Sequence, residues 1–96
     1  MAGPWSYPTE LLEPLRSLGV SPAPETPPAL ARTAVDGLYK YELRRARTRL
    51  RMGEFARAEY FGVIVALRKK YWMLTLSVSA WERICEAPTV LRPPSL

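Results

Sequence analysis

The chain has 96 residues, no histidine, a single cysteine (Cys85) and five glycines that are scattered along its length. Without histidine there is no imidazole base and no histidine-ligated metal. One cysteine forms neither an internal disulfide nor a multi-cysteine metal cluster. The scattered glycines also exclude a glycine-rich phosphate-binding loop. We therefore expect a protein that is not an enzyme and has no catalytic residues, cofactor or metal.

Long apolar runs are missing as well. The two most apolar stretches are residues 58–67 and 71–81, and Arg68-Lys69-Lys70 separates them. Both are shorter than the roughly 20 residues needed to cross a bilayer. Residues 1–5 lack the basic stretch followed by an apolar run that marks a secretory signal. The sequence thus predicts a cytoplasmic protein with no transmembrane segment, and leaves open a peripheral place on a membrane complex.

Proline is absent from the middle of the chain. Seven of the ten prolines fall in residues 4–28, three fall in residues 88–96, and none lies between them. Because proline lacks a backbone donor and fixes φ, it is excluded from most helix interiors. We therefore divide the chain into a proline-rich arm with one short helix (1–28), a helical centre (29–87) and a proline-rich tail (88–96).

The centre has helical periodicity. Apolar residues recur at spacings of three and four in two stretches, 26–52 and 56–73, which predicts two amphipathic helices. The short connection Gly53-Glu54-Phe55 makes them an antiparallel hairpin. Ser79-Ala80-Trp81-Glu82 has the spacing of a capping box and predicts a final short helix to about residue 87. The predicted fold class is all-α, a helical hairpin with short flanking helices and extended proline-rich arms at both ends.

Arginine supplies most of the positive charge. The net charge is +5, and five arginines occur in residues 44–51 without an acidic residue among them. At 100° per residue, four basic side chains fall within about 60° of one another on the first long helix. This basic stripe consists of Lys40, Arg44, Arg47 and Arg51. Arginine favours bidentate contacts with carboxylates and phosphates.

Several environments suit the basic stripe. The interpretation we favour is a solvated face, or one that pairs with acidic side chains of a partner protein. Nucleic-acid phosphates are the second choice, with Tyr39 and Tyr41 available for stacking, and anionic lipid is the third. A net charge of +5 is modest for a nucleic-acid binder, and no basic tail is present to wrap a groove.

The second long helix has an apolar face beyond the one expected to meet the first helix. Phe61, Val65 and Trp72 lie roughly 100–140° around the helix from the predicted seam. Either the arm and the last helix cover this face, with Trp5 or Trp81 inserted there, or it is a partner-binding surface. Tryptophan is enriched at interface hot spots. The predicted protein-binding residues are therefore Phe61, Val65, Trp72, Trp5 and Trp81.

Two short stretches resemble known families. Leu38-Tyr39-Lys40, followed by Arg44-Arg45 and Phe55, resembles the motif of the small helical LYR proteins, with lysine in place of their usual arginine. That resemblance implies an assembly subunit of respiratory or iron–sulfur machinery. Residues 49–67 are similar to the SHOCT helical-hairpin domain, mostly through a general helix–glycine–helix pattern. Neither match carries a functional residue over, and the sequence assigns the chain to no family.

These features together predict a non-catalytic accessory subunit that stabilises a larger multi-subunit protein complex. The arms would contact neighbouring subunits, because extended segments give a large contact area and become ordered on binding. The apolar face and the basic stripe would supply the remaining contacts. The alternative is a small basic protein that binds RNA or DNA through the stripe.

Overall fold

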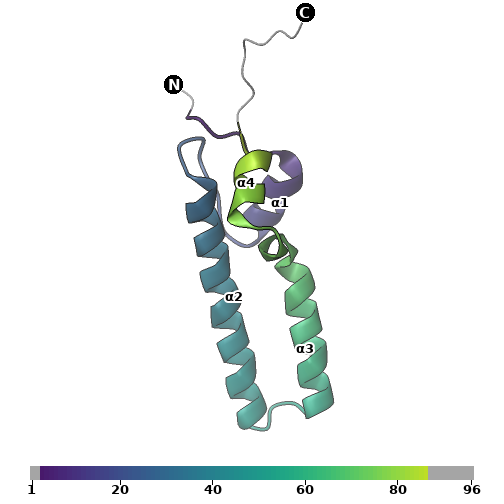
Figure 1. The fold of residues 1–96 in the computed structure, drawn as a ribbon. Helices are drawn as coiled ribbons and strands as arrows, with labels where there is room; N and C mark the ends of the chain where they lie inside the picture. The colour runs from purple at the N-terminus through teal and green to yellow at the C-terminus, as the bar shows by residue number, and fades with distance from the viewer. Residues whose placement is uncertain (1–2, 87–96) are drawn as a thin grey trace, which may run out of the picture.

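The computed structural model describes residues 3–86 and is predominantly helical (Figure 1). Its elements, in chain order, are α1 (Thr9–Ser17), α2 (Pro28–Arg51), α3 (Arg57–Lys70), the 3₁₀ helix η1 (Trp72–Thr75) and α4 (Val78–Ile84). Over this range the one strand-like pairing is an isolated antiparallel bridge between Trp5 and Glu86. The predicted all-α class is confirmed. The predicted tail, residues 88–96, lies outside the described residues.

Helices α2 and α3 lie side by side and run in opposite directions (Figure 1). Helix α2 begins at Pro28, where a missing N–H costs nothing, and its N-cap residue is Pro27, one residue after the predicted N-cap Thr26. The Thr26 hydroxyl instead accepts a hydrogen bond from the Ala23 N–H at 3.0 Å. Gly53, with φ of 73°, ends α2 as predicted, because glycine adopts this left-handed conformation without strain.

The second half of the chain departs from the predicted boundaries. Helix α3 ends at Lys70, where the sequence predicted an end near residue 73, and the chain tightens into η1. Ser77, rather than Ser79, caps α4: its hydroxyl accepts the Ala80 N–H at 3.1 Å. Ser77 has extended backbone angles suited to a cap, whereas Ser79 is already inside the helix, so the capping-box prediction was wrong by two residues.

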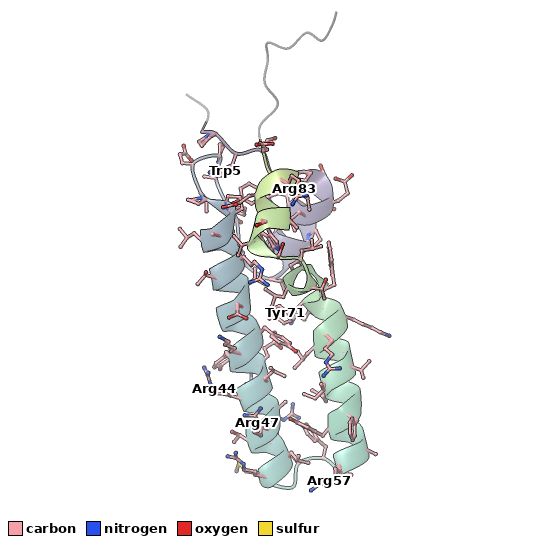
Figure 2. The ribbon with its side chains drawn as sticks, viewed as in Figure 1. Trp5, Arg44, Arg47, Arg57, Tyr71 and Arg83 are labelled. Atoms are coloured by element: carbon pink, nitrogen blue, oxygen red, sulfur yellow. The ribbon has the colours of Figure 1, made fainter. Side chains whose placement is uncertain are left out.

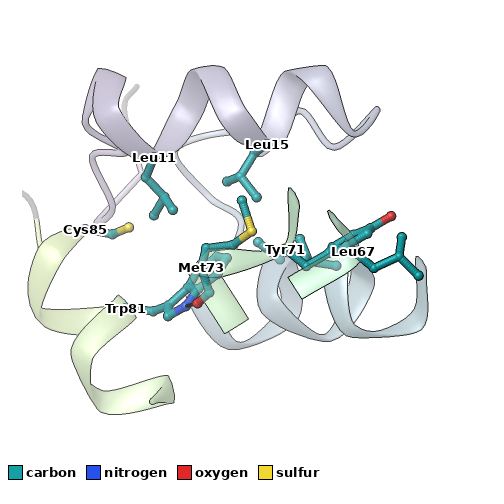
Figure 3. Close-up of a cluster of buried hydrophobic side chains, with 9 residues drawn as sticks. Leu11, Leu15, Leu67, Tyr71, Met73, Trp81 and Cys85 are labelled. Carbon is teal, nitrogen blue, oxygen red and sulfur yellow. Dashed lines mark hydrogen bonds between the residues drawn. The ribbon is translucent and has the colours of Figure 1, made fainter. Parts of the chain in front are cut away.

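The core lies at the end of the molecule where α1, η1 and α4 meet α2 and α3. Figure 3 shows the leucines of α1 directed toward Met73, Trp81 and Cys85. Met73, Trp81 and Cys85 are all completely buried. The buried members of this core cluster are Leu11, Leu15, Ala31, Val35, Leu67, Tyr71, Met73, Trp81 and Cys85.

The N-terminal segment packs on its own chain, in contrast to the expectation of an arm extended onto neighbours. The Trp5 N–H donates to the Pro24 carbonyl at 3.1 Å, and the Ser6 N–H donates to the Cys85 carbonyl at 2.7 Å. Helix α1 places leucines four residues apart, so that Leu11 and Leu15 are only 2% and 0% exposed. Enough apolar surface is therefore present in this segment to order it against the core.

Two polar contacts secure the junction between the long helices and the core. The Arg32 guanidinium on α2 donates to the Leu74 and Leu76 carbonyls, both at 2.9 Å. The buried Trp81 indole N–H donates to the Met73 carbonyl at 2.9 Å. These three carbonyls lie where regular α-helical hydrogen bonding stops after α3, so the Arg32 and Trp81 side chains supply donors where the helical pattern ends.

Candidate functional site

The outer face of α3 is apolar and exposed. Phe61 and Val65 lie one turn apart, and Trp72 follows two turns later, just past the end of the helix. Their exposed fractions are 69%, 47% and 41%. The residues that pack toward α2, including Val63, Leu67 and Tyr71, lie on the opposite side of the helix. We call Phe61, Val65 and Trp72 the outer α3 face; no segment within residues 3–86 covers it.

Positive charge flanks the outer α3 face. Arg68 and Lys69 fall on the same side by helical spacing, between Val65 and Trp72, and both are exposed. Glu59, in the first turn, uses its carboxylate to accept the Ala56 N–H at 2.7 Å and so caps the helix. The surface thus combines aromatic and aliphatic side chains with cations, and the one acidic side chain of α3 is engaged in capping the helix.

The basic stripe lies on α2, with all four members exposed. Arg44 is on the side of α2 that faces away from α3 (Figure 2). Lys40 makes an i,i+4 ion pair with Asp36 at 2.9 Å. Within residues 3–86 no carboxylate lies within ion-pair distance of Arg44, Arg47 or Arg51.

A shallow open hollow borders the stripe. Its lining is Tyr41, Arg44, Arg45, Thr48, Arg49 and Glu54, and we call it the arginine hollow. Five of these positions have the spacing i, i+3, i+4, i+7 and i+8, so one face of α2 carries them. Glu54 closes the hollow from the turn and pairs with Arg49 at 3.0 Å. The Arg49 guanidinium also lies over the Phe55 ring, 5.0 Å from its centroid.

The carboxylate of Glu42 is turned toward α3, away from the stripe. It accepts the Tyr71 hydroxyl and the Lys70 ammonium, the latter at 3.0 Å. Burial opposes the ionisation of Glu42, but these two hydrogen bonds and the nearby charges outweigh it and lower its pKa. Burial and the bond to Glu42 raise the pKa of Tyr71. Glu42 thus joins α2 to α3.

The two other predicted contact tryptophans belong to the packing of the chain itself. Trp81 is 0% exposed, so its placement is incompatible with a contact role on an accessible surface. Trp5 is half-buried against the core cluster. Neither tryptophan covers the outer α3 face, since Phe61 and Val65 remain exposed there.

The sequence interpretation missed the arginine hollow. It chose Lys40, Arg44, Arg47 and Arg51 because they align on the helix, and left Arg45 and Arg49 out of the candidate surface. The signal that identifies the hollow is the hydroxyl spacing: Tyr41 and Thr48 are seven residues apart and share a face with Arg44 and Arg45.

Over residues 3–86, no helix is long and apolar enough to cross a membrane, and no three histidine, cysteine, aspartate or glutamate side chains gather in a metal-binding arrangement. Comparison of the chain with protein-family models, curated proteins and solved structures found no match.

Proposed function

We propose that the protein is a non-catalytic accessory subunit that binds and stabilises a larger protein complex through the outer α3 face. The observation that supports this is the exposure of Phe61, Val65 and Trp72 on a single face of one helix. Burying a side chain of this size against a partner contributes about 1.5–3 kcal/mol. Three of them would suffice as the centre of an interface whose rim is polar.

The proposed partner has an apolar groove with acidic side chains along its rim. The groove would take Phe61 and Trp72, and the acids would meet Arg68 and Lys69. Such charge pairs at a rim affect association rate and specificity more than affinity. The proposed setting is the cytoplasm, either free or at the periphery of a membrane complex.

Within this proposal, the α2–α3 hairpin is a rigid carrier for the contact surface. The Arg32 contacts and the Glu42–Tyr71 hydrogen bond fix α2 and α3 relative to the core end. A preorganised surface loses less conformational entropy on binding than a flexible one. The proline-rich tail remains a second proposed contact segment.

The test is recovery of partners from the native host with the purified, tagged chain, quantified by mass spectrometry. Phe61→Ala/Trp72→Ala should reduce the recovery of specific partners at least about tenfold while far-UV circular dichroism stays unchanged, since both side chains are exposed. Leu30→Ala/Ile84→Ala is the matched control, because it also removes two exposed apolar side chains, which lie on α2 and α4.

The control should retain partner recovery. Loss of helicity in Phe61→Ala/Trp72→Ala without any change in the recovered proteins would assign these residues to the fold. Equal losses with both double variants would show that recovery depends on general surface hydrophobicity, and would also contradict the proposal.

A further inference from the structure

The arginine hollow contains more guanidiniums than the acidic side chains around it pair with. Each acidic side chain of residues 36–54 forms an ion pair with a basic side chain of the same chain. Asp36 pairs with Lys40, Glu42 with Lys70, and Glu54 with Arg49. Within residues 3–86, the guanidiniums of Arg44 and Arg45 make no ion pair or side-chain hydrogen bond. Arg47 and Arg51, on the adjacent stripe, extend the same surface. The hollow therefore attracts an anion that the chain itself does not supply.

The remaining groups in the hollow favour phosphate over carboxylate-bearing protein. Thr48 adds a hydroxyl donor beside the guanidiniums, and Arg44 and Arg45 present forked N–H donors that match phosphate oxygens as well as carboxylates. The Tyr41 ring is 54% exposed beside them. An exposed aromatic ring next to a row of cations is the arrangement on which nucleobases stack, whereas an acidic peptide makes no use of it.

The dimensions and openness of the surface suit a strand. From Tyr41 to Arg49, α2 rises about 12 Å, which is more than one phosphate requires. The hollow is open to solvent, and its lining residues come only from α2 and the turn that follows it. We propose that the arginine hollow binds the sugar-phosphate backbone of single-stranded nucleic acid, with a base stacked on Tyr41.

This binding is separate from the proposed protein interface. The arginine hollow is lined by α2 and the turn that follows it, with no residue of α3, whereas the outer α3 face lies on α3 and just past its end. Both surfaces are available at the same time. The inference therefore does not depend on the identity of a protein partner, and it can be tested with the isolated chain.

The experiment measures fluorescence anisotropy of a labelled 20-nucleotide oligo(U) or oligo(dT) titrated with the full chain at several salt concentrations. About three phosphate contacts predict a slope of about −2 for log K against log salt. Arg44→Gln/Arg45→Gln removes two contacts and should weaken binding about 25-fold at 0.1 M salt, with the slope falling to about −0.7.

The matched control is Arg16→Gln/Arg83→Gln, which removes the same charge from exposed residues on α1 and α4, at the core end of the molecule. It should change affinity by less than about threefold, because only the long-range charge is lost. If both double variants weaken binding equally, the attraction is a property of net charge and the site does not exist.

Tyr41 separates nucleic acid from an acidic protein as the ligand. Tyr41→Leu should weaken oligonucleotide binding about tenfold, and Tyr41→Phe should preserve it, because the ring and not the hydroxyl stacks on a base. Competition by poly-glutamate or by phosphatidylserine vesicles at equal charge concentration should be weak. The proposal would be overturned if poly-glutamate or the vesicles competed as strongly as unlabelled oligonucleotide. It would also be overturned if the chain bound no oligonucleotide at 0.1 M salt.

Discussion

The two ends of the molecule differ in how many of their apolar side chains are buried. At the core end, α1, η1 and α4 enclose the first turns of α2, and nine buried side chains form one cluster. At the far end, across residues 44–64, Ala46 is the only fully buried side chain. There two helices meet without a third layer, so each keeps one face toward solvent. The far end thus contributes less to stability and displays most of the proposed binding residues.

The largest expected effect is at Trp81. Trp81→Ala removes a completely buried indole and its hydrogen bond to the Met73 carbonyl. Large-to-small changes of this kind cost about 3–5 kcal/mol, comparable to the whole stability of a small domain. Far-UV circular dichroism and urea titration should show a mostly unfolded chain. Trp81→Phe, which keeps most of the ring volume, should be folded but weakened; a near-native Trp81→Ala midpoint would contradict the core assignment.

The second expected effect compares the two ends directly. Leu15→Ala at the core end should lower the free energy of unfolding by about 2–5 kcal/mol, because Leu15 is 0% exposed. Ile64→Ala at the far end should cost about 1–2 kcal/mol, because Ile64 is only half-buried. Urea unfolding of both variants gives the two values. Equal costs would mean that the far end is as tightly packed as the core end, or that α1 does not dock as described.

The third expected effect is at the junction between the ends. Arg32→Ala removes two charge-assisted hydrogen bonds and leaves the Leu74 and Leu76 carbonyls without that donor. We expect a loss of about 1–3 kcal/mol in urea unfolding. Arg32→Lys should recover only part of it, because a single ammonium cannot reproduce the planar fork. As a control, Arg68→Ala, on the exposed side of α3, should stay within about 0.5 kcal/mol of wild type.

The smallest expected effect concerns Glu42. Its folded-state pKa is lowered, so its stabilising contribution is present above the unfolded-state pKa and is lost as pH falls through the folded-state pKa. Glu42→Gln should therefore reduce stability at pH 7 and make the unfolding midpoint less dependent on pH between about 5 and 3. Thermal unfolding at a series of pH values measures this. An unchanged pH dependence would show that the bonds to Tyr71 and Lys70 do not contribute.

The sequence was informative wherever short-range periodicity decides the structure. The apolar side chains predicted to form the seam between the two long helices are buried or half-buried in the structure, and Gly53 in the predicted connection has a φ of 73°. The seam residues are Val35, Tyr39, Leu43, Ala46, Leu50, Tyr60, Val63, Ile64, Leu67, Tyr71 and Leu74. Spacing alone identifies such positions because one helix face must pack on the other.

Features that depend on contacts between distant segments were not predictable in this way. The proline content of the first 28 residues concealed that Leu11 and Leu15 enter the core between η1 and α4. Trp81 looked like an interface residue because its burial depends on α1, some 70 positions earlier in the chain. The arginine hollow could not be identified without the internal ion pairs. These pairs separate the guanidiniums that bind a carboxylate of the chain from those that do not.

The most direct test of the central claim is amide hydrogen exchange on α3 in the complex recovered with the tagged chain. If the outer α3 face is the docking surface, amides of residues 58–70 should exchange at least about tenfold more slowly in the complex than in the free chain. Those of α1 should be unchanged, because its leucines already pack in the core. Equal α3 exchange rates in the free and bound chain would contradict the account.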